Sequence, residues 1–192
     1  MPAPPKSRSY SIALVFMIVL VSGCTKVSTD QTKGGYVAGN GSITIVPVSE
    51  RKPAPDLTGK DLEGRPISMD KFKGKTLVVN IWGSWCPPCR EEAPALIEAS
   101  RSLKPKGVEF LGIAIRESPA ASKAFTDRLE VPYPSISDES GRLLVGFSKS
   151  LPAIAVPTTY VIDNKGRVAA RILDKVTATS LSDVVDDVLE GR

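Results

Sequence analysis

The chain has 192 residues, which is long enough for one domain with additional segments but too short for two full domains. Hydrophobic residues make up 42% of the chain and charged residues 24%, as in globular proteins, while 16 prolines and 15 glycines argue against an all-helical bundle. The net charge of +4 is too small to indicate a nucleic-acid partner, and the absence of histidine excludes histidine-based triads and metal sites.

Residues 1–23 are typical of a secretory signal peptide that is cleaved. Lys6 and Arg8 give a basic start, and an unbroken apolar run of ten residues (IALVFMIVLV) follows over 12–21. This run is about half as long as a membrane-spanning helix of roughly 20 residues. Without the leader, the chain carries 23 basic and 21 acidic residues and a net charge of about +2. An uncleaved anchor remains an alternative.

Cys24 directly follows this leader. The stretch Leu20-Val21-Ser22-Gly23-Cys24 resembles the lipobox of bacterial lipoproteins, in which the cysteine becomes the lipidated first residue of the mature chain. Acyl chains on Cys24 would hold the protein at a membrane surface. Residues 24–54 are rich in Ser, Thr, Gly, Lys and Asn, which cannot bury a core, so a flexible linker is expected there. Only 43–46 (ITIV) has the composition of a short strand.

The folded domain is predicted over residues 55–192. A small hairpin is expected over 57–68, which contains two glycines between semi-polar runs, and one helical turn over 69–72. The run TLVVNIW over 76–82 is apolar on both faces, as the central strand of a covered sheet requires.

Helical and strand patterns then alternate. Apolar residues at helical spacing predict a helix over 91–103, and VEFLGIAI over 108–115 predicts a second buried strand. Because a helix connects these two strands, they are expected to be parallel. Ser118 is a predicted N-cap of a helix that begins with a proline and runs to about Leu129.

The last part of the chain returns to strands. Residues 131–136 contain two prolines and are expected to form an edge strand. Residues 158–162 and 168–173 flank the turn sequence DNKG and predict an antiparallel hairpin, before a closing helix over 180–189. The order of elements predicts an α/β fold, with a central mixed β-sheet flanked by helices and an N-terminal hairpin extension.

Two cysteines besides Cys24 lie in the run Trp85-Cys86-Pro87-Pro88-Cys89, between a buried strand and the start of a helix. Zinc would need two further ligands, and the sequence has no other free cysteine and no histidine, so no metal is expected. A static disulfide is the alternative, but it would close a very short loop and restrict the unfolded chain little. The position favours a redox pair.

The expected chemistry assigns each residue of this motif a role. At the start of a helix, Cys86 is favoured as a thiolate and is the predicted nucleophile. Cys89, one turn further in, should be buried and resolve the mixed disulfide. Pro88 stiffens the turn, Pro87 stiffens it further, and Trp85 is expected to pack beside an exposed Cys86 sulfur.

The run VNIWGSWCPPCREEAP over 79–94, followed by VPTTYVID over 156–163, resembles the thioredoxin fold, specifically membrane-tethered proteins of the TlpA/ResA type. The resemblance covers roughly residues 55–189 and implies a thiol–disulfide oxidoreductase without a cofactor. Thioredoxins keep an acid where Asn80 stands here. In the TlpA/ResA group, a glutamate that matches Glu92 is implied to relay protons, and its spacing from Cys89 places it on the same helical face. An exposed surface glutamate is the alternative.

The resemblance also implies substrate contacts. Pro157 matches the cis-proline loop that packs against the cysteine pair, with a trans turn as the alternative. The backbone before this proline pairs with substrate in the family, so Val156 is an implied contact, together with the residues beside the cysteines (Trp85, Pro87 and Pro88).

The implied protein is a monomer, lipid-anchored at the cell membrane on its extracytoplasmic side. It would reduce disulfides of exported proteins, such as those of cytochrome c maturation or copper-centre assembly, with a DsbD- or CcdA-like membrane thiol carrier as electron donor. Alternatives are a disulfide-forming oxidase of the same fold and a ligand-binding lipoprotein with a structural disulfide. A peroxiredoxin would need a threonine three residues before Cys86, where Gly83 stands.

Overall fold

The computed structural model describes residue 1, residues 36–37 and residues 43–192. The predicted signal peptide, Cys24 and the first part of the predicted linker therefore lie outside the described residues, apart from residue 1 and residues 36–37. All elements below belong to one unit, residues 33–192. Within the described ranges, no helix has both the length and the apolar character needed to cross a membrane.

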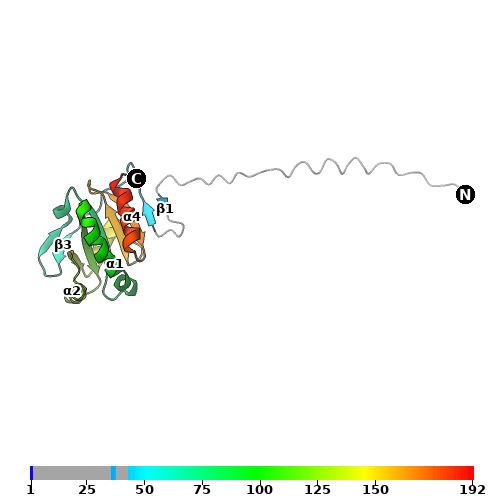
Figure 1. The fold of residues 1–192 in the computed structure, drawn as a ribbon. Helices are drawn as coiled ribbons and strands as arrows, with labels where there is room; N and C mark the ends of the chain where they lie inside the picture. The colour runs from blue at the N-terminus through cyan, green and yellow to red at the C-terminus, as the bar shows by residue number, and fades with distance from the viewer. Residues whose placement is uncertain (2–35, 38–42) are drawn as a thin grey trace. The chain divides into compact units, whose positions relative to one another are not determined.

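A mixed nine-stranded sheet forms the centre of this unit (Figure 1). In chain order, the strands are β1 (Tyr36–Val37), β2 (Ile43–Ile45), β3 (Thr58–Asp61), β4 (Pro66–Ser68), β5 (Thr76–Trp82), β6 (Val108–Ile115), β7 (Ser135–Asp138), β8 (Thr158–Ile162) and β9 (Val168–Leu173). Their spatial order is β1-β2-β9-β8-β5-β6-β7-β3-β4. Strands β5, β6 and β7 are parallel, and β8 and β9 run antiparallel to their neighbours.

Over residues 43–192, four α-helices and three 3₁₀ turns accompany the sheet. They are α1 (Pro87–Leu103), α2 (Pro119–Arg128), α3 (Arg142–Gly146), α4 (Ala178–Leu189), η1 (Met69–Phe72), η2 (Lys104–Lys106) and η3 (Phe147–Lys149). Helices α1 and α4 lie side by side on one face of the sheet (Figure 1). The predicted elements over 57–68, 69–72, 76–82, 91–103, 108–115, 118–129, 158–162, 168–173 and 180–189 are all present.

The two faces of the sheet bury separate hydrophobic clusters, because successive side chains of a strand point to opposite faces. On β5, Val78 packs in the cluster that includes Leu96 of α1 and Leu181 of α4. Its neighbours Leu77 and Val79 belong to the opposite cluster, which is closed by the first hairpin, η1 and η3. All seven residues of β5 are buried, which agrees with its uninterrupted apolar sequence.

The predicted domain boundary at residue 55 is wrong, because residues 43–54 belong to the fold. Strand β2 pairs with β9, and Pro53 bridges to Arg167. Arg51 is buried, donates to the carbonyls of Val46 (3.0 Å) and Arg192 (2.8 Å), and forms an ion pair of 3.4 Å with Asp163. The polar composition of this segment predicted a linker because its partners lie more than a hundred residues away.

Two predictions about the segment after α2 also need correction. The strand expected at the edge over 131–136 is β7, which begins at Ser135 and lies between β6 and β3. Its prolines precede the strand, so they remove no hydrogen bond from it, and the Pro134 carbonyl accepts one from Gly112 at 2.9 Å. The helices α3 and η3 carry no signal that predicted them from the sequence. The N-cap of α3, Gly141, has a φ of 71°, which favours glycine.

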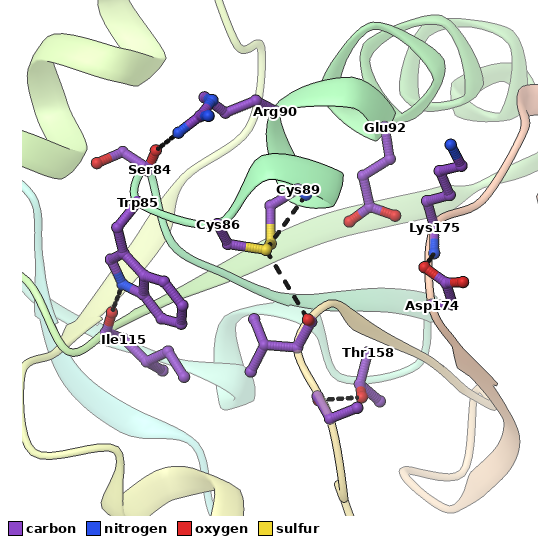
Figure 2. Close-up of a disulfide and its surroundings, with 12 residues drawn as sticks. Ser84, Trp85, Cys86, Cys89, Arg90, Glu92, Ile115, Thr158, Asp174 and Lys175 are labelled. Atoms are coloured by element: carbon purple, nitrogen blue, oxygen red, sulfur yellow. Dashed lines mark hydrogen bonds between the residues drawn. A yellow bond between two sulfur atoms is a disulfide. The ribbon is translucent and has the colours of Figure 1, made fainter.

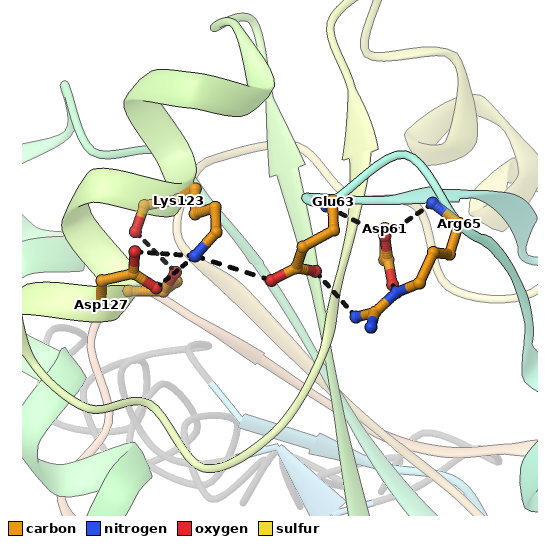
Figure 3. Close-up of polar contacts among 6 residues, drawn as sticks. Asp61, Glu63, Arg65, Lys123 and Asp127 are labelled. Atoms are coloured by element: carbon orange, nitrogen blue, oxygen red, sulfur yellow. Dashed lines mark hydrogen bonds and ion pairs between the residues drawn. The ribbon is translucent and has the colours of Figure 1, made fainter.

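The hairpin β3–β4 is joined to α2 by a chain of charged side chains (Figure 3). Arg65 pairs with Asp61 at 2.8 Å and with Glu63 at 3.0 Å, and Lys123 of α2 lies 3.7 Å from Glu63 and 2.7 Å from Asp127. Arg65 and Glu63 are exposed, so solvent screens the pairs that they form.

Candidate active site

The cysteine pair lies where the central strand gives way to the first long helix. Strand β5 ends at Trp82, and Cys86 is the N-cap of α1, with an extended backbone (φ −89°, ψ 113°). Its sulfur accepts a hydrogen bond from the Cys89 backbone N–H at 3.3 Å. Pro87 and Pro88 occupy the first two helical positions, where their missing N–H groups remove no helical hydrogen bond.

Cys86 and Cys89 form a disulfide with a Cα–Cα distance of 5.3 Å (Figure 2). Cys89 is 3% exposed, as expected. The expectation of an exposed Cys86 is wrong for this oxidised form, because Cys86 is only 2% exposed. Its side chain turns inward to cap the helix and to meet the Val156 carbonyl oxygen, 3.8 Å from Sγ.

Trp85 provides the exposed part of the motif. Its side chain is 46% exposed, and its indole N–H donates to the Ile115 carbonyl at the end of β6, at 3.0 Å (Figure 2). Gly83 permits this placement, because a Cβ at position 83 would clash with the indole ring. The indole is therefore held in place by β6 while part of its surface stays exposed beside the disulfide.

The loop before β8 lies against the disulfide. The Val156–Pro157 bond is cis, as the resemblance implied. Val156 is half-buried against the cluster that contains both cysteines, and the Ala155 carbonyl accepts a hydrogen bond from the Thr158 hydroxyl at 2.7 Å. The Pro157 carbonyl accepts one from the Asp174 N–H at 3.2 Å, which joins this loop to the loop after β9.

Glu92 is buried rather than exposed, so the alternative of a surface glutamate is wrong for its position. It is 1% exposed, and Figure 2 shows its carboxylate on the side of α1 where the sulfurs lie. One oxygen accepts from the Asn80 amide (2.9 Å) and the other from the Val176 N–H (3.0 Å). The pKa of Glu92 is raised to about 7, mainly by burial and to a smaller extent by the Asp174 charge, while the hydrogen bonds from Asn80 and Val176 oppose the rise.

The sequence indicates only that Asn80 stands where thioredoxins have an acidic residue. In the structure, it is the direct partner of Glu92, and its amide also donates to the Thr159 hydroxyl at 3.1 Å. A cavity of about 20 Å³ lies beside Cys89 and is lined in part by Asn80, Tyr133 and Ser135. This is room for about one water molecule. The sequence could not predict this pair, because the spacing of residues along β5 does not show which residue of α1 Asn80 will contact.

Comparisons with known proteins agree with this geometry. The model of the AhpC/TSA family matches residues 51–171. The chain is 30% identical to thiol-disulfide oxidoreductase ResA of Bacillus cereus over 174 residues, covering 91% of this chain and 94% of that protein. ResA of Bacillus subtilis is 28% identical over 145 residues, 76% of this chain and 79% of the relative.

Two solved structures are similar as well. A secreted thiol-disulfide isomerase from Corynebacterium glutamicum superposes with a TM-score of 0.71 at 30% identity, covering 78% of this chain and 93% of that one. A DsbF homologue from Corynebacterium diphtheriae has a TM-score of 0.68 at 32% identity, with coverages of 80% and 99%. With a family match over more than half its length, the chain belongs to the AhpC/TSA family and is a thioredoxin-like thiol–disulfide oxidoreductase of the ResA-related group.

Proposed function

We propose that the protein reduces disulfides of exported proteins through a mixed disulfide at Cys86. The observation that carries this proposal is the position of Cys86 as the helix N-cap, where its sulfur faces a backbone N–H and the cis-proline loop. In the dithiol form, that position favours the thiolate. The same loop offers the Val156 carbonyl to an incoming chain.

The proposed cycle transfers two electrons to the substrate. The Cys86 thiolate attacks one sulfur of the substrate disulfide, and the other substrate sulfur leaves and takes up a proton. Cys89 then loses its proton to Glu92 and attacks the Cys86 sulfur, which releases the second substrate thiol and closes the Cys86–Cys89 disulfide. A carboxyl with a pKa of about 7 can both accept and return this proton near neutral pH.

Substrate contacts are proposed for the residues that surround the disulfide. The exposed indole of Trp85 and the ring of Pro87 offer apolar surface, and Pro88 keeps the turn rigid beneath them. The backbone of Val156 and Pro157 is proposed to pair with an extended substrate segment. The family resemblance implies the same contact. These contacts favour a protein segment that carries a disulfide as the partner.

We place the protein on the extracytoplasmic side of the membrane, held by a lipid on Cys24. The apolar leader and the lipobox-like sequence support this placement, and a similar solved protein is described as secreted. A DsbD- or CcdA-like membrane thiol carrier would then return the protein to its dithiol form. Apocytochrome c and copper-centre assembly proteins are the proposed substrates.

The direction of electron flow between the protein and its substrate can be tested by measuring the reduction potential of the Cys86–Cys89 disulfide. A reductase is expected to have a potential near that of thioredoxin, about −270 mV, whereas a value near about −120 mV would identify the protein as a disulfide-forming oxidase. The physiological partners can be identified with Cys89→Ala, which should retain substrates as mixed disulfides at Cys86. Cys86→Ala is the matched control and should retain none. Equal trapping by both variants would contradict the assignment of the nucleophile.

A further inference from the structure

A carboxylate outside the cysteine motif holds the loop that leads to the nucleophile. Glu117 follows the end of β6 and directly precedes Ser118, the N-cap of α2. One carboxylate oxygen accepts hydrogen bonds from the Ser84 backbone N–H (2.9 Å) and the Ser122 hydroxyl (2.8 Å). The other oxygen accepts from the Ser84 hydroxyl. Glu117 thus joins α2 to a residue two positions before Cys86.

The remaining polar groups of this loop are held as well. The Ser84 carbonyl accepts from the Arg90 guanidinium at 2.9 Å, so each of the three polar groups of Ser84 has a partner. The Trp85 indole is bonded to the end of β6, and the Cys86 N–H donates to the Gly83 carbonyl at 3.1 Å. The loop from Gly83 to Cys86 is therefore fastened to β6, α1 and α2 together.

We propose that Glu117 is a positioning residue for the thiol chemistry, acting through Ser84. In the oxidised protein, the disulfide itself fixes Cys86 against Cys89. When that bond opens, we expect the Cys86 sulfur to be held only by its contacts with the Cys89 N–H and the Val156 carbonyl, so that its direction depends on the loop before it. The Glu117 carboxylate keeps this loop, and with it the Trp85 indole, in the geometry of attack. This proposal rests on the oxidoreductase activity but not on the direction of electron flow.

Two properties distinguish this role from general stabilisation. The contacts are needed most in the reduced state, so their loss should affect thiol reactivity more than the melting of the oxidised protein. The role also depends on hydrogen bonding and not on charge. In Glu117→Gln, the amide oxygen can still accept from the Ser84 N–H and Ser122, while the amide N–H₂ can donate to the Ser84 hydroxyl.

The test compares full-length Glu117→Ala, Glu117→Gln and Ser84→Ala, with Glu98→Ala as a control on the exposed face of α1. The readouts are the rate of iodoacetamide alkylation of reduced Cys86 across pH, and tryptophan fluorescence in both redox states, measured in a Trp82→Phe background so that Trp85 is the emitting residue. We expect about tenfold slower alkylation of the Cys86 thiolate and a red-shifted reduced-state emission for Glu117→Ala, because small displacements of reacting groups are costly. Glu117→Gln and Glu98→Ala should behave like the wild type.

Ser84→Ala loses one of the contacts and should slow alkylation about threefold, which keeps the proposal testable if Glu117→Ala does not fold. A wild-type alkylation profile in Ser84→Ala, or in folded Glu117→Ala, would overturn it. So would a loss in Glu117→Gln equal to that in Glu117→Ala, because charge would then be responsible. Insulin reduction by the wild type is measured separately. Its failure would refute the proposed reductase function and leave the alkylation result standing.

Discussion

Replacing Glu92 with glutamine should remove a large part of the pH dependence of stability. The pKa of this buried carboxyl is raised from 4.5 to about 7, mainly by desolvation. The folded protein therefore keeps the Glu92 proton to a higher pH than the unfolded chain does. This contribution to stability is complete below about pH 4.5 and is lost as the pH rises through about 7.

The size of the effect follows from the difference between the two pKa values. At 1.36 kcal/mol per pH unit, ionisation of Glu92 costs the wild type about 3 kcal/mol by pH 8. The amide of the Glu92→Gln variant cannot ionise, so the variant avoids this cost. Its N–H₂ group would face the Val176 N–H and lose one hydrogen bond, a penalty of about 1–3 kcal/mol that is the same at every pH.

Urea unfolding of the oxidised protein between pH 4 and pH 8.5 measures this directly. The stability of Glu92→Gln relative to the wild type should rise by about 3 kcal/mol across the range, with a midpoint halfway between the two pKa values, at about pH 6. Glu98→Gln, on the exposed face of the same helix, is the control. Parallel curves for Glu92→Gln and the wild type would refute the raised pKa and, with it, the proposed proton exchange with Cys89.

Three further predictions concern other parts of the chain. Asp174→Asn should lower the pKa of Glu92 by less than about one pH unit, seen as an earlier midpoint in the same unfolding series, because it removes an exposed like charge; no shift would exclude that coupling. Arg51→Ala should lower the free energy of unfolding by about 3 kcal/mol and make residues 43–54 the first site of proteolysis, whereas Arg51→Lys should have a smaller effect on both. Unchanged proteolysis of Arg51→Ala would contradict the assignment of residues 43–54 to the fold. Cys24→Ala should release the protein from membranes in cell fractionation, whereas continued attachment would indicate an uncleaved leader.

The strands and helices near the site were predictable because their signals are local. The apolar runs that became β5 and β6 match those strands residue for residue, and Ser118 and the double proline at 87–88 mark helix starts. An apolar run shows that a strand is buried on both faces, and a capping residue or proline marks a helix start. Both signals can be read from residues that are adjacent in the sequence.

Features that depend on distant partners were not predictable. A short strand was predicted at 43–46, but its place in the sheet was not, because β2 pairs with β1 and with β9, which lies more than a hundred residues further along the chain. The prolines of the β7 region suggested an edge, but they lie before the strand and leave its ladder intact. Glu117 carries no motif of its own, since its partner Ser84 is 33 residues away on another loop. The inward position of Cys86 likewise depends on the Val156 loop, 70 residues further along the chain.

The start of the sheet at β1 limits how far the enzyme can travel from its proposed point of attachment. From Cys24 to Tyr36 the chain advances by only 12 residues, which span at most about 40 Å even when fully extended. Had the domain begun at residue 55, this distance would have been about 105 Å. If Cys24 is lipidated, a substrate disulfide must therefore come close to the bilayer surface to react with Cys86.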